Sequence, residues 1–367
     1  MQNVIKSPRS LDVDITNRCN LRCKYCYHFS GPGDVDTDLP KEEWLQFFAE
    51  CGRCAVMELS LAGGEPFFRK DLPELLEGII ANRMRFALLS NGTLIDEAWA
   101  RYLKGTRRCS HVQVSIDGSR PEIHDRLRGS GQFDKAVAGL QALQRHDVPV
   151  AVRVTLTKLN YRDLENIARL LLEDLGLPSF STNAASYMGL CKLNDQEIGL
   201  DVSERSETMA VFAVLNQRYP GRIQANAGPL AEMRMWSEME RARLGGSAPA
   251  YPVGALTACG CVFDRMAIRA DGVMIPCTML SHMEMGRVNQ DSLQQVWQNH
   301  PLMRAMRERQ KISLNSFAFC LDCEYINYCT GNCPGVAYEL TGDINHPSPD
   351  ACFKRFLGAG GVLPQIR

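Results

Sequence analysis

RCNLRCKYCY, residues 18–27, is the stretch on which the organisation of the chain depends. It follows alternating apolar residues at 11–15, which predict a half-buried strand, and it places Cys19, Cys23 and Cys26 directly after that strand. A structural zinc site needs four ligands, whereas three cysteines on a cubane 4Fe–4S cluster leave one iron open for a small chelating ligand. No fourth ligand lies at knuckle spacing, so we favour a cluster over a zinc knuckle or a chance group of buried thiols.

Composition and charge exclude several classes of protein. The chain has 367 residues, enough for one large or two medium domains. Its 41 Lys and Arg balance 42 Asp and Glu, so no basic field points to nucleic acid. Without an N-terminal apolar segment or an 18-residue apolar run, we expect a cytoplasmic protein with no membrane span. Fifteen cysteines, an odd number with ligand-like spacing, indicate metal rather than disulfides.

Short apolar runs alternate with longer amphipathic segments over the first half of the chain. The predicted strands are 11–16, 56–61, 85–89, 111–116, 150–156 and 179–183, and the predicted helices are 41–50, 72–83, 96–103, 133–145 and 161–175. This order predicts an α/β fold with parallel strands and right-handed crossovers. Six units cannot close an eight-stranded barrel, so we expect an open, partial (β/α)6 TIM-like barrel whose chemistry lies at the C-terminal strand ends.

Three motifs lie at or just after those strand ends. GGEP follows the second strand and contains Gly63, Gly64, Glu65 and Pro66. Its glycines let backbone approach a ligand closely, and Glu65 is able to accept from an ammonium group. SNGT at 90–93 follows the third strand, and SIDG at 115–118 ends the fourth; their candidates are Ser90, Asn91, Ser115 and Asp117, followed by Arg126 and Arg128. Hydroxyls suit a ribose and an arginine fork suits a carboxylate, although a turn with a helix cap explains Ser-Asp-Gly equally well.

The remainder divides into a bridging region and a cysteine-rich end. Helices are predicted over 201–219 and 230–244; the second carries a methionine stripe that packs in the core or lines a substrate channel. A break at 245–249 leads to the predicted domains 1–185, 186–258 and 259–367. The last domain contains eight cysteines, enough to close two four-coordinate clusters or two zinc sites. Of the other four, Cys51, Cys54 and Cys109 are interpreted as structural and Cys191 as a free loop thiol.

These motifs together resemble the radical S-adenosylmethionine enzymes. The matching segments are CNLRCKYCY at 19–27, GGEP, SNGT, SIDG and HDRLRG at 124–129. The resemblance implies a 4Fe–4S cluster on Cys19, Cys23 and Cys26, whose open iron is chelated by the amino and carboxylate groups of S-adenosylmethionine. Reduction then cleaves a carbon–sulfur bond and releases a 5′-deoxyadenosyl radical that abstracts a substrate hydrogen.

The resemblance also implies contacts to the cofactor. Tyr25 would pack against it, and Gly64 with Glu65 would hold its amino group. Ser115 would contact the ribose region, while the carboxylate would take Arg128 or its competitor Arg126. Gly63, Pro66, Ser90, Asn91 and Asp117 complete the expected binding set.

The C-terminal spacing resembles the SPASM domain of many such enzymes, which implies two auxiliary clusters and three 4Fe–4S clusters in all. The outer cluster would be held by Cys320, Cys323, Cys329 and Cys352, and the inner one by Cys259, Cys261, Cys277 and Cys333. The C-x-C spacing at 259–261 is shorter than in relatives. One of those two cysteines is therefore a candidate non-ligand, and its absence from the cluster would leave an iron open for substrate.

Enzymes of this kind mostly modify peptides or proteins, so our leading hypothesis is a maturase of a ribosomally made peptide that receives electrons from a flavodoxin or ferredoxin. Ten residues precede the first strand, so we expect leader recognition by a separate protein or by the SPASM domain. A rival hypothesis is sulfatase-type maturation, which Thr278 disfavours because that subfamily has an aspartate at this place. Small-molecule or tetrapyrrole side-chain modification is a second rival, and a non-catalytic electron carrier is a third.

Overall fold

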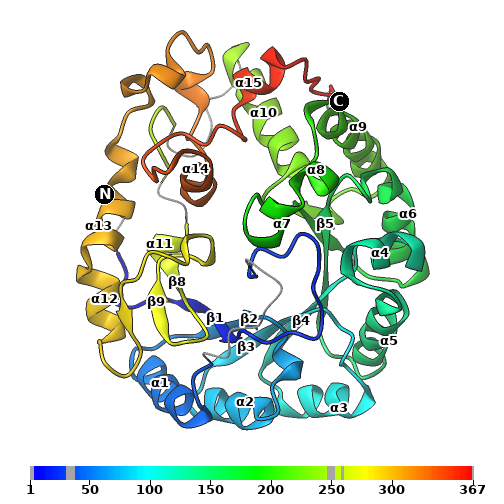
Figure 1. Cartoon of the computed structure of the whole chain (residues 1–367), viewed down its shortest axis with the longest axis vertical. Helices are drawn as coiled ribbons and strands as arrows, with labels where there is room; N and C mark the ends of the chain where they lie inside the picture. The colour runs from blue at the N-terminus through cyan, green and yellow to red at the C-terminus, as the bar shows by residue number, and fades with distance from the viewer. Residues whose placement is uncertain (1–3, 30–37, 246–252, 258–259, 366–367) are drawn as a thin grey trace.

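The computed structural model describes residues 4–29, 38–245, 253–257 and 260–365, excluding the side chain of Cys261. Six consecutive parallel strands form its N-terminal half, each within about two residues of its predicted bounds. They are β1 (Ser10–Thr16), β2 (Glu58–Gly63), β3 (Arg85–Ser90), β4 (Cys109–Ser115), β5 (Val150–Leu156) and β6 (Phe180–Ala184). The open, partial barrel predicted from the sequence is confirmed, and Figure 1 shows its strands in a curved row.

The sheet is longer at both ends than the sequence predicts. β7 (Ile223–Ala225) adds a parallel strand beside β6, and β8 (Arg265–Ile268) pairs in parallel with β1. β9 (Val273–Ile275) and β10 (Gly286–Arg287) continue antiparallel from β8. The ten strands therefore run in the order β10-β9-β8-β1-β2-β3-β4-β5-β6-β7. The sheet crosses the predicted boundary at 258, and the three-domain division stays a prediction.

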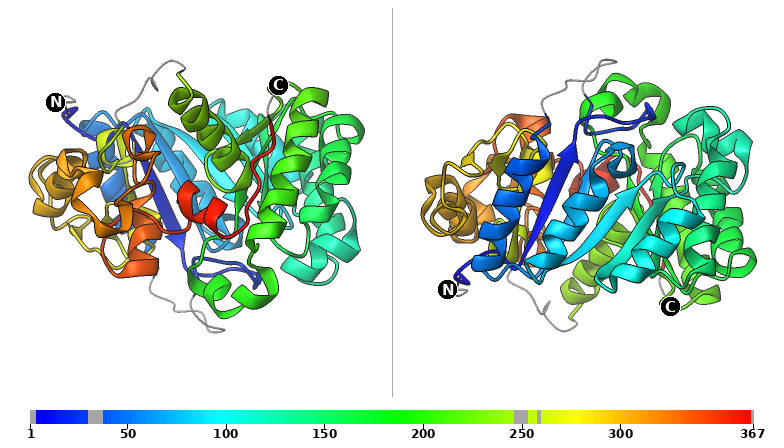
Figure 2. Two further views of the ribbon diagram at one scale, coloured as in Figure 1. Left: turned by 90° about the horizontal axis from the view of Figure 1, so that it is seen from above. Right: turned by 90° about the horizontal axis from the view of Figure 1, so that it is seen from below.

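Helices cover the outer face of this sheet (Figures 1 and 2). Those predicted in the barrel are α1 (Lys41–Arg53), α2 (Leu72–Ala81), α3 (Glu97–Thr106), α5 (Gln132–Arg145) and α6 (Leu164–Arg169), which continues as a π-helix over Leu170–Asp174. Asp96 caps the N-terminus of α3, since its carboxylate accepts from the Trp99 amide at 2.8 Å. α4 (Pro121–Arg128) was not predicted.

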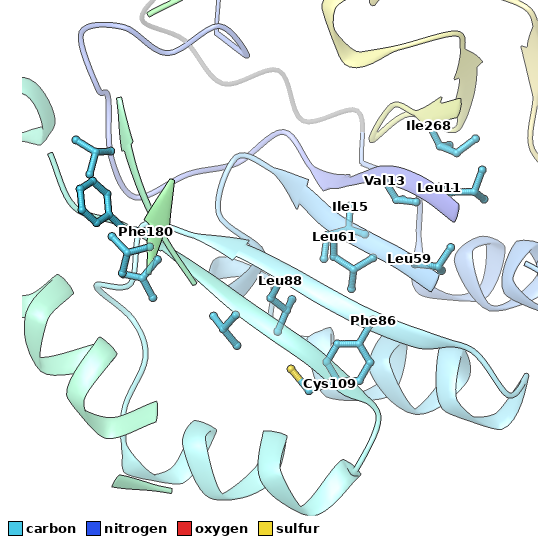
Figure 3. Close-up of a cluster of buried hydrophobic side chains, with 14 of the residues drawn as sticks. Leu11, Val13, Ile15, Leu59, Leu61, Phe86, Leu88, Cys109, Phe180 and Ile268 are labelled. Carbon is cyan, nitrogen blue, oxygen red and sulfur yellow. The ribbon is translucent and has the colours of Figure 1, made fainter. Parts of the chain in front are cut away.

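The core lies between the strands and these helices. Leu11, Val13 and Ile15 of β1 are fully buried there with apolar residues of β2, β3 and β8 (Figure 3). Because side chains alternate along a strand, Asp12 and Asp14 face the opposite, inner side of the barrel. Cys109 lies in the same core, which supports its structural interpretation.

The bridging region contains α7 (Gly189–Leu193), α8 (Asp195–Ile198), α9 (Val202–Arg218) and α10 (Pro229–Arg243). Cys191 lies in α7 rather than in the predicted loop, and it is buried because it packs against Leu127 and Ile198. The predicted break after Gly245 lies outside the described residues. Stacking of Trp236 on Phe353, with ring centroids 5.1 Å apart, joins α10 to the C-terminal α15 (Phe353–Gly358). Among the described helices, none is long and apolar enough to cross a membrane.

Candidate active site

Three half-buried thiols follow β1, where the sequence predicts them. Cys19, Cys23 and Cys26 lie on one loop, which is folded by a hydrogen bond from the Cys26 amide to the Cys23 carbonyl at 3.0 Å. The pKa of Cys19 is raised to about 12 and that of Cys23 to about 11, mainly by burial and also by the charge of neighbouring thiols. A cationic centre would reverse that balance, because metal ligation requires the thiolate. The donor set therefore fits a centre with three cysteine ligands.

The two glycines of GGEP are required by a close backbone approach to that loop. The Gly64 amide donates to Thr16 at 2.8 Å and the Glu65 amide donates to Arg18 at 2.9 Å. A Cβ on Gly64 would lie 2.1 Å from the Arg18 carbonyl oxygen, and one on Gly63 would lie 2.3 Å from the Thr16 oxygen. Gly63 also has a φ of 107°. GGEP thus fits directly against the segment that carries the first cysteine.

The Glu65 carboxylate links GGEP to SNGT. It is 1% exposed and accepts from Ser90 Oγ and the Asn91 amide, each at 2.8 Å, and from the Phe67 amide at 3.2 Å, next to Pro66 at the start of a 3₁₀ turn. Burial raises its pKa to about 7 against these three donors. The side chain is thus occupied within the protein, and it positions the ends of β2 and β3.

Asn91 carries this connection on to the cysteine loop. Its Nδ2 donates to Asn20 Oδ1 at 2.9 Å and lies 4.0 Å from Cys19 Sγ. The first cysteine is therefore held beside both motifs that follow β2 and β3.

α4 distinguishes between the two candidate arginines. His124, Leu127 and Arg128 lie on its buried face, whereas Arg126 is exposed on the other. The sequence carried a signal for this helix, because Pro121 occupies its first turn and positions 124 and 128 share a face. The structure brings Arg128, and not Arg126, to the cysteine loop.

Arg128 belongs to a buried network with Asp117 and Tyr25. Its guanidinium donates to the Asp117 carboxylate and to the Tyr25 hydroxyl, and the Tyr25 hydroxyl in turn donates to Asp117. Its third nitrogen lies 3.9 Å from Cys23 Sγ. Burial opposes the charge of Arg128, yet Asp117, Tyr25 and Cys23 raise its pKa above the ordinary value. Asp117 is fully buried and also accepts from the Thr155 amide at 2.7 Å.

The inner face of the barrel contains polar residues that the sequence analysis did not single out. Asp12 and Asp14 project from β1 and Arg153 projects from β5, on the same face as the predicted Ser115 at the end of β4. Asp14 Oδ1 and Arg153 Nε are buried and have no hydrogen-bond partner among the described residues. The sequence could have indicated these residues, because charged residues lie at alternate positions of an otherwise apolar strand.

The four predicted outer-cluster cysteines line one cavity of about 290 Å³; they are Cys320, Cys323, Cys329 and Cys352. Burial, together with the other three thiols, raises the pKa of Cys320 to about 12. The four thiols therefore line a common cavity, and their ligation of a cluster stays a prediction.

The predicted inner set is described only in part. Cys277 lies close enough to Tyr27 of the cysteine loop to influence its titration. Cys333 lines a cavity of about 550 Å³ with the buried Glu232 of α10. Cys259 and the side chain of Cys261 lie outside the described residues. Within the described part of the chain, no three His, Cys, Asp or Glu side chains lie close enough to share one metal ion, and this includes the three cysteines after β1 and the four of the outer set. A cubane cluster needs no such grouping, because each cysteine binds a different iron.

The methionine stripe of α10 is divided between the core and a cavity, and its lining of a substrate channel stays a prediction. Met233 and Met239 are buried in the core with Trp236. Met235, by contrast, lines the 550 Å³ cavity.

Comparison with known proteins places these features in a family. The model of the radical SAM superfamily matches residues 13–171, and that of an iron–sulfur cluster-binding domain, SPASM, matches residues 259–324. Fe-coproporphyrin III synthase of Methanosarcina barkeri is 28% identical over 93% of this chain and 86% of its own length. Mycofactocin maturase MftC of Mycobacterium tuberculosis is 28% identical over 94% of this chain and 83% of its own.

The fold is also that of a solved structure. Streptococcus suis SuiB bound to its precursor peptide SuiA superposes with a TM-score of 0.71 at 17% identity, covering 96% of this chain and 77% of SuiB. At this identity the likeness concerns the fold alone. The iron–sulfur model favours clusters over zinc for the C-terminal cysteines. The chain belongs to the radical S-adenosylmethionine superfamily and carries a C-terminal SPASM iron–sulfur cluster-binding domain.

Proposed function

We propose that this enzyme cleaves S-adenosylmethionine reductively and uses the resulting 5′-deoxyadenosyl radical to modify a ribosomally synthesised peptide. The observation that carries the radical chemistry is the contact between the cysteine loop and GGEP, where a Cβ on Gly64 has no room beside Arg18. An iron–sulfur cluster bound there supplies an electron to the sulfonium cofactor. All further steps depend on how the protein binds, orients and shields the reactants.

Cys19, Cys23 and Cys26 would hold that cluster. The backbone of Gly63, Gly64 and Glu65 would face the cofactor's amino group, since the Glu65 side chain is already occupied by its three donors. Pro66, Ser90 and Asn91 keep this backbone in place, and Ser115 would contact the ribose region.

Arg128 is the arginine we propose near the cofactor's carboxylate, because Arg126 is exposed. Asp117 and Tyr25 fix the orientation of Arg128, so that its remaining guanidinium nitrogen is directed toward Cys23. Burial of this network excludes water from the place where the radical forms.

We further propose two auxiliary 4Fe–4S clusters, three clusters in all. The cavity between Cys320, Cys323, Cys329 and Cys352 supports the outer one. Cys277 and Cys333 would share the inner one with Cys259 and Cys261. The electron donor would be a flavodoxin or ferredoxin, and a separate protein would present the leader of the peptide.

The peptide substrate is favoured by mycofactocin maturase, a relative that matches 94% of this chain. SuiB, whose structure was solved with a precursor peptide bound, has the same fold. Tetrapyrrole modification is the second candidate, because Fe-coproporphyrin III synthase matches equally well at 28% identity. Sulfatase-type maturation is disfavoured by Thr278, which follows Cys277 where an aspartate is expected.

The test is anaerobic turnover of the reconstituted, reduced enzyme with S-adenosylmethionine. Short peptides encoded beside the gene are compared with iron coproporphyrin III, and products are followed by mass spectrometry. We expect 5′-deoxyadenosine in every assay and a mass change in a peptide. A change in the tetrapyrrole alone would establish the second candidate, and absence of 5′-deoxyadenosine would refute the radical chemistry.

A further inference from the structure

A polar cavity of about 380 Å³ lies between the cysteine loop and the C-terminal domain. Asp14, Tyr27 and His28 line it from the N-terminal half, and Arg269, Asp271 and His282 line it from the segment around β9. Asp14 also adjoins GGEP, because a Cβ on Gly63 would lie 3.2 Å from Asp14 Cβ. A group bound in this cavity would therefore lie beside the proposed cofactor site.

Asp14 is a buried carboxylate that lacks a donor. It is 6% exposed, and its Oδ1 has no hydrogen-bond partner among the described residues. Its Oδ2 lies 3.6 Å from His28 Nδ1, too far for a hydrogen bond. His28 Nε2 lies 3.0 Å from the amide oxygen of Asn17, which can only accept, so the ring donates there instead. A buried carboxylate without a donor is costly, and a ligand that donates would remove this cost.

The charges around the cavity favour a cation. Arg269 is fully engaged, because it donates to Asp271 at 3.0 Å, to Glu284 at 2.9 Å and to the Ser281 carbonyl at 3.0 Å. Asp12, which lies on the same face of β1, adds negative charge near Asp14. Arg153 interacts with Tyr27 but is not among the lining residues.

The Tyr27 ring adds a second element of cation recognition. It lines the same cavity as the unpartnered Asp14 oxygen, and an aromatic ring attracts ammonium and guanidinium groups. A carboxylate acceptor beside an aromatic ring is thus suited to a basic side chain.

We propose that this cavity binds a cationic group of the substrate, the ammonium of a lysine or the guanidinium of an arginine, with Asp14 as its acceptor. The inference rests on the proposed peptide substrate. Because Asp14 adjoins Gly63, a basic residue anchored here would hold neighbouring residues of the peptide beside GGEP.

The test measures binding without turnover. Holoenzyme loaded with S-adenosylmethionine is kept anaerobic and unreduced, and three probes are titrated by ligand-observed NMR. They are the Nα-acetyl N-methylamides of lysine, arginine and norleucine, the last being a neutral analogue of lysine. We expect at least one cationic probe to bind roughly tenfold or more tightly than norleucine, as for a charge-assisted hydrogen bond.

Asp14→Asn should abolish this preference, because the amide keeps the shape but loses the charge. Asp147→Asn is the matched control: Asp147 has a side chain that is 88% exposed, and its substitution should change nothing. Equal binding of all three probes to the wild type would overturn the inference, and this comparison needs no variant. A persistent preference in Asp14→Asn, with iron content intact, would also overturn it. Either result leaves 5′-deoxyadenosine formation, and hence the proposed function, to be judged separately.

Discussion

Gly64→Ala should separate the two loops that form the proposed cofactor site. A Cβ at this position would lie 2.1 Å from the Arg18 carbonyl oxygen, whereas ordinary contact begins at 3.4 Å. The obstacle is backbone rather than a flexible side chain, so the loops must move apart by about 1.3 Å. The same oxygen accepts the Glu65 amide at 2.9 Å, and that hydrogen bond would break. Leaving these groups unpaired costs roughly 1–3 kcal/mol.

The displacement reaches the cluster because Arg18 immediately precedes Cys19. The assay is anaerobic reconstitution followed by iron and sulfide analysis. Three cubanes predict about twelve irons per chain in the wild type, and the variant should retain about eight in the auxiliary clusters. Formation of 5′-deoxyadenosine should be lost together with the four irons of the cluster on Cys19, Cys23 and Cys26.

The matched control is Gly105→Ala. Gly105 lies in α3, and a Cβ there meets nothing within 4 Å. This substitution should leave the iron content unchanged and stabilise the protein by roughly 0.4–1 kcal/mol. Full iron loading and normal 5′-deoxyadenosine formation in Gly64→Ala would refute the packing argument.

Three further results are expected. Arg128→Ala should weaken S-adenosylmethionine binding at least roughly tenfold by equilibrium dialysis, because a buried charge partner is lost, while Arg126→Ala should match the wild type. Cys352→Ala should remove about four irons, and Cys109→Ala should remove none; equal iron in both would contradict the assigned outer cluster. Burial raises the pKa of Glu232 to about 7, so the folded protein holds this proton more tightly than the unfolded chain does. Its contribution to stability is complete below the unfolded pKa and declines as pH rises through 7, by at most about 3 kcal/mol. Glu232→Gln should therefore reduce the fall in melting temperature between pH 5.5 and 8, and an unchanged fall would contradict the assignment.

The barrel strands could be predicted from sequence because each carries its own local pattern. β1 alternates apolar and polar residues, and β5 was placed at its observed bounds, Val150–Leu156. α4 was missed because a segment of eight residues with charges on several positions has a weak apolar pattern. Its omission left the choice between Arg126 and Arg128 open, and only the face of the helix decides it.

Contacts between segments that are distant in the chain could not be predicted from the sequence. The Glu65 carboxylate was expected to face a ligand, yet it turns toward Ser90, 25 residues away. That choice follows from how the ends of β2 and β3 meet, which no local pattern encodes. The unpartnered oxygen of Asp14 likewise becomes visible only when the segment around β9 closes the cavity.

The pairing of β8 with β1 has a consequence for how the chain matures. Val13 meets Ile268, 255 positions further along, so the ribosome must extend most of the polypeptide before the first strand gains its outer neighbour. Contacts this remote in sequence form slowly, and a bare strand edge invites association with other chains. A translation product truncated before Arg265 is therefore expected to aggregate along that edge, because β8 covers it in the folded protein.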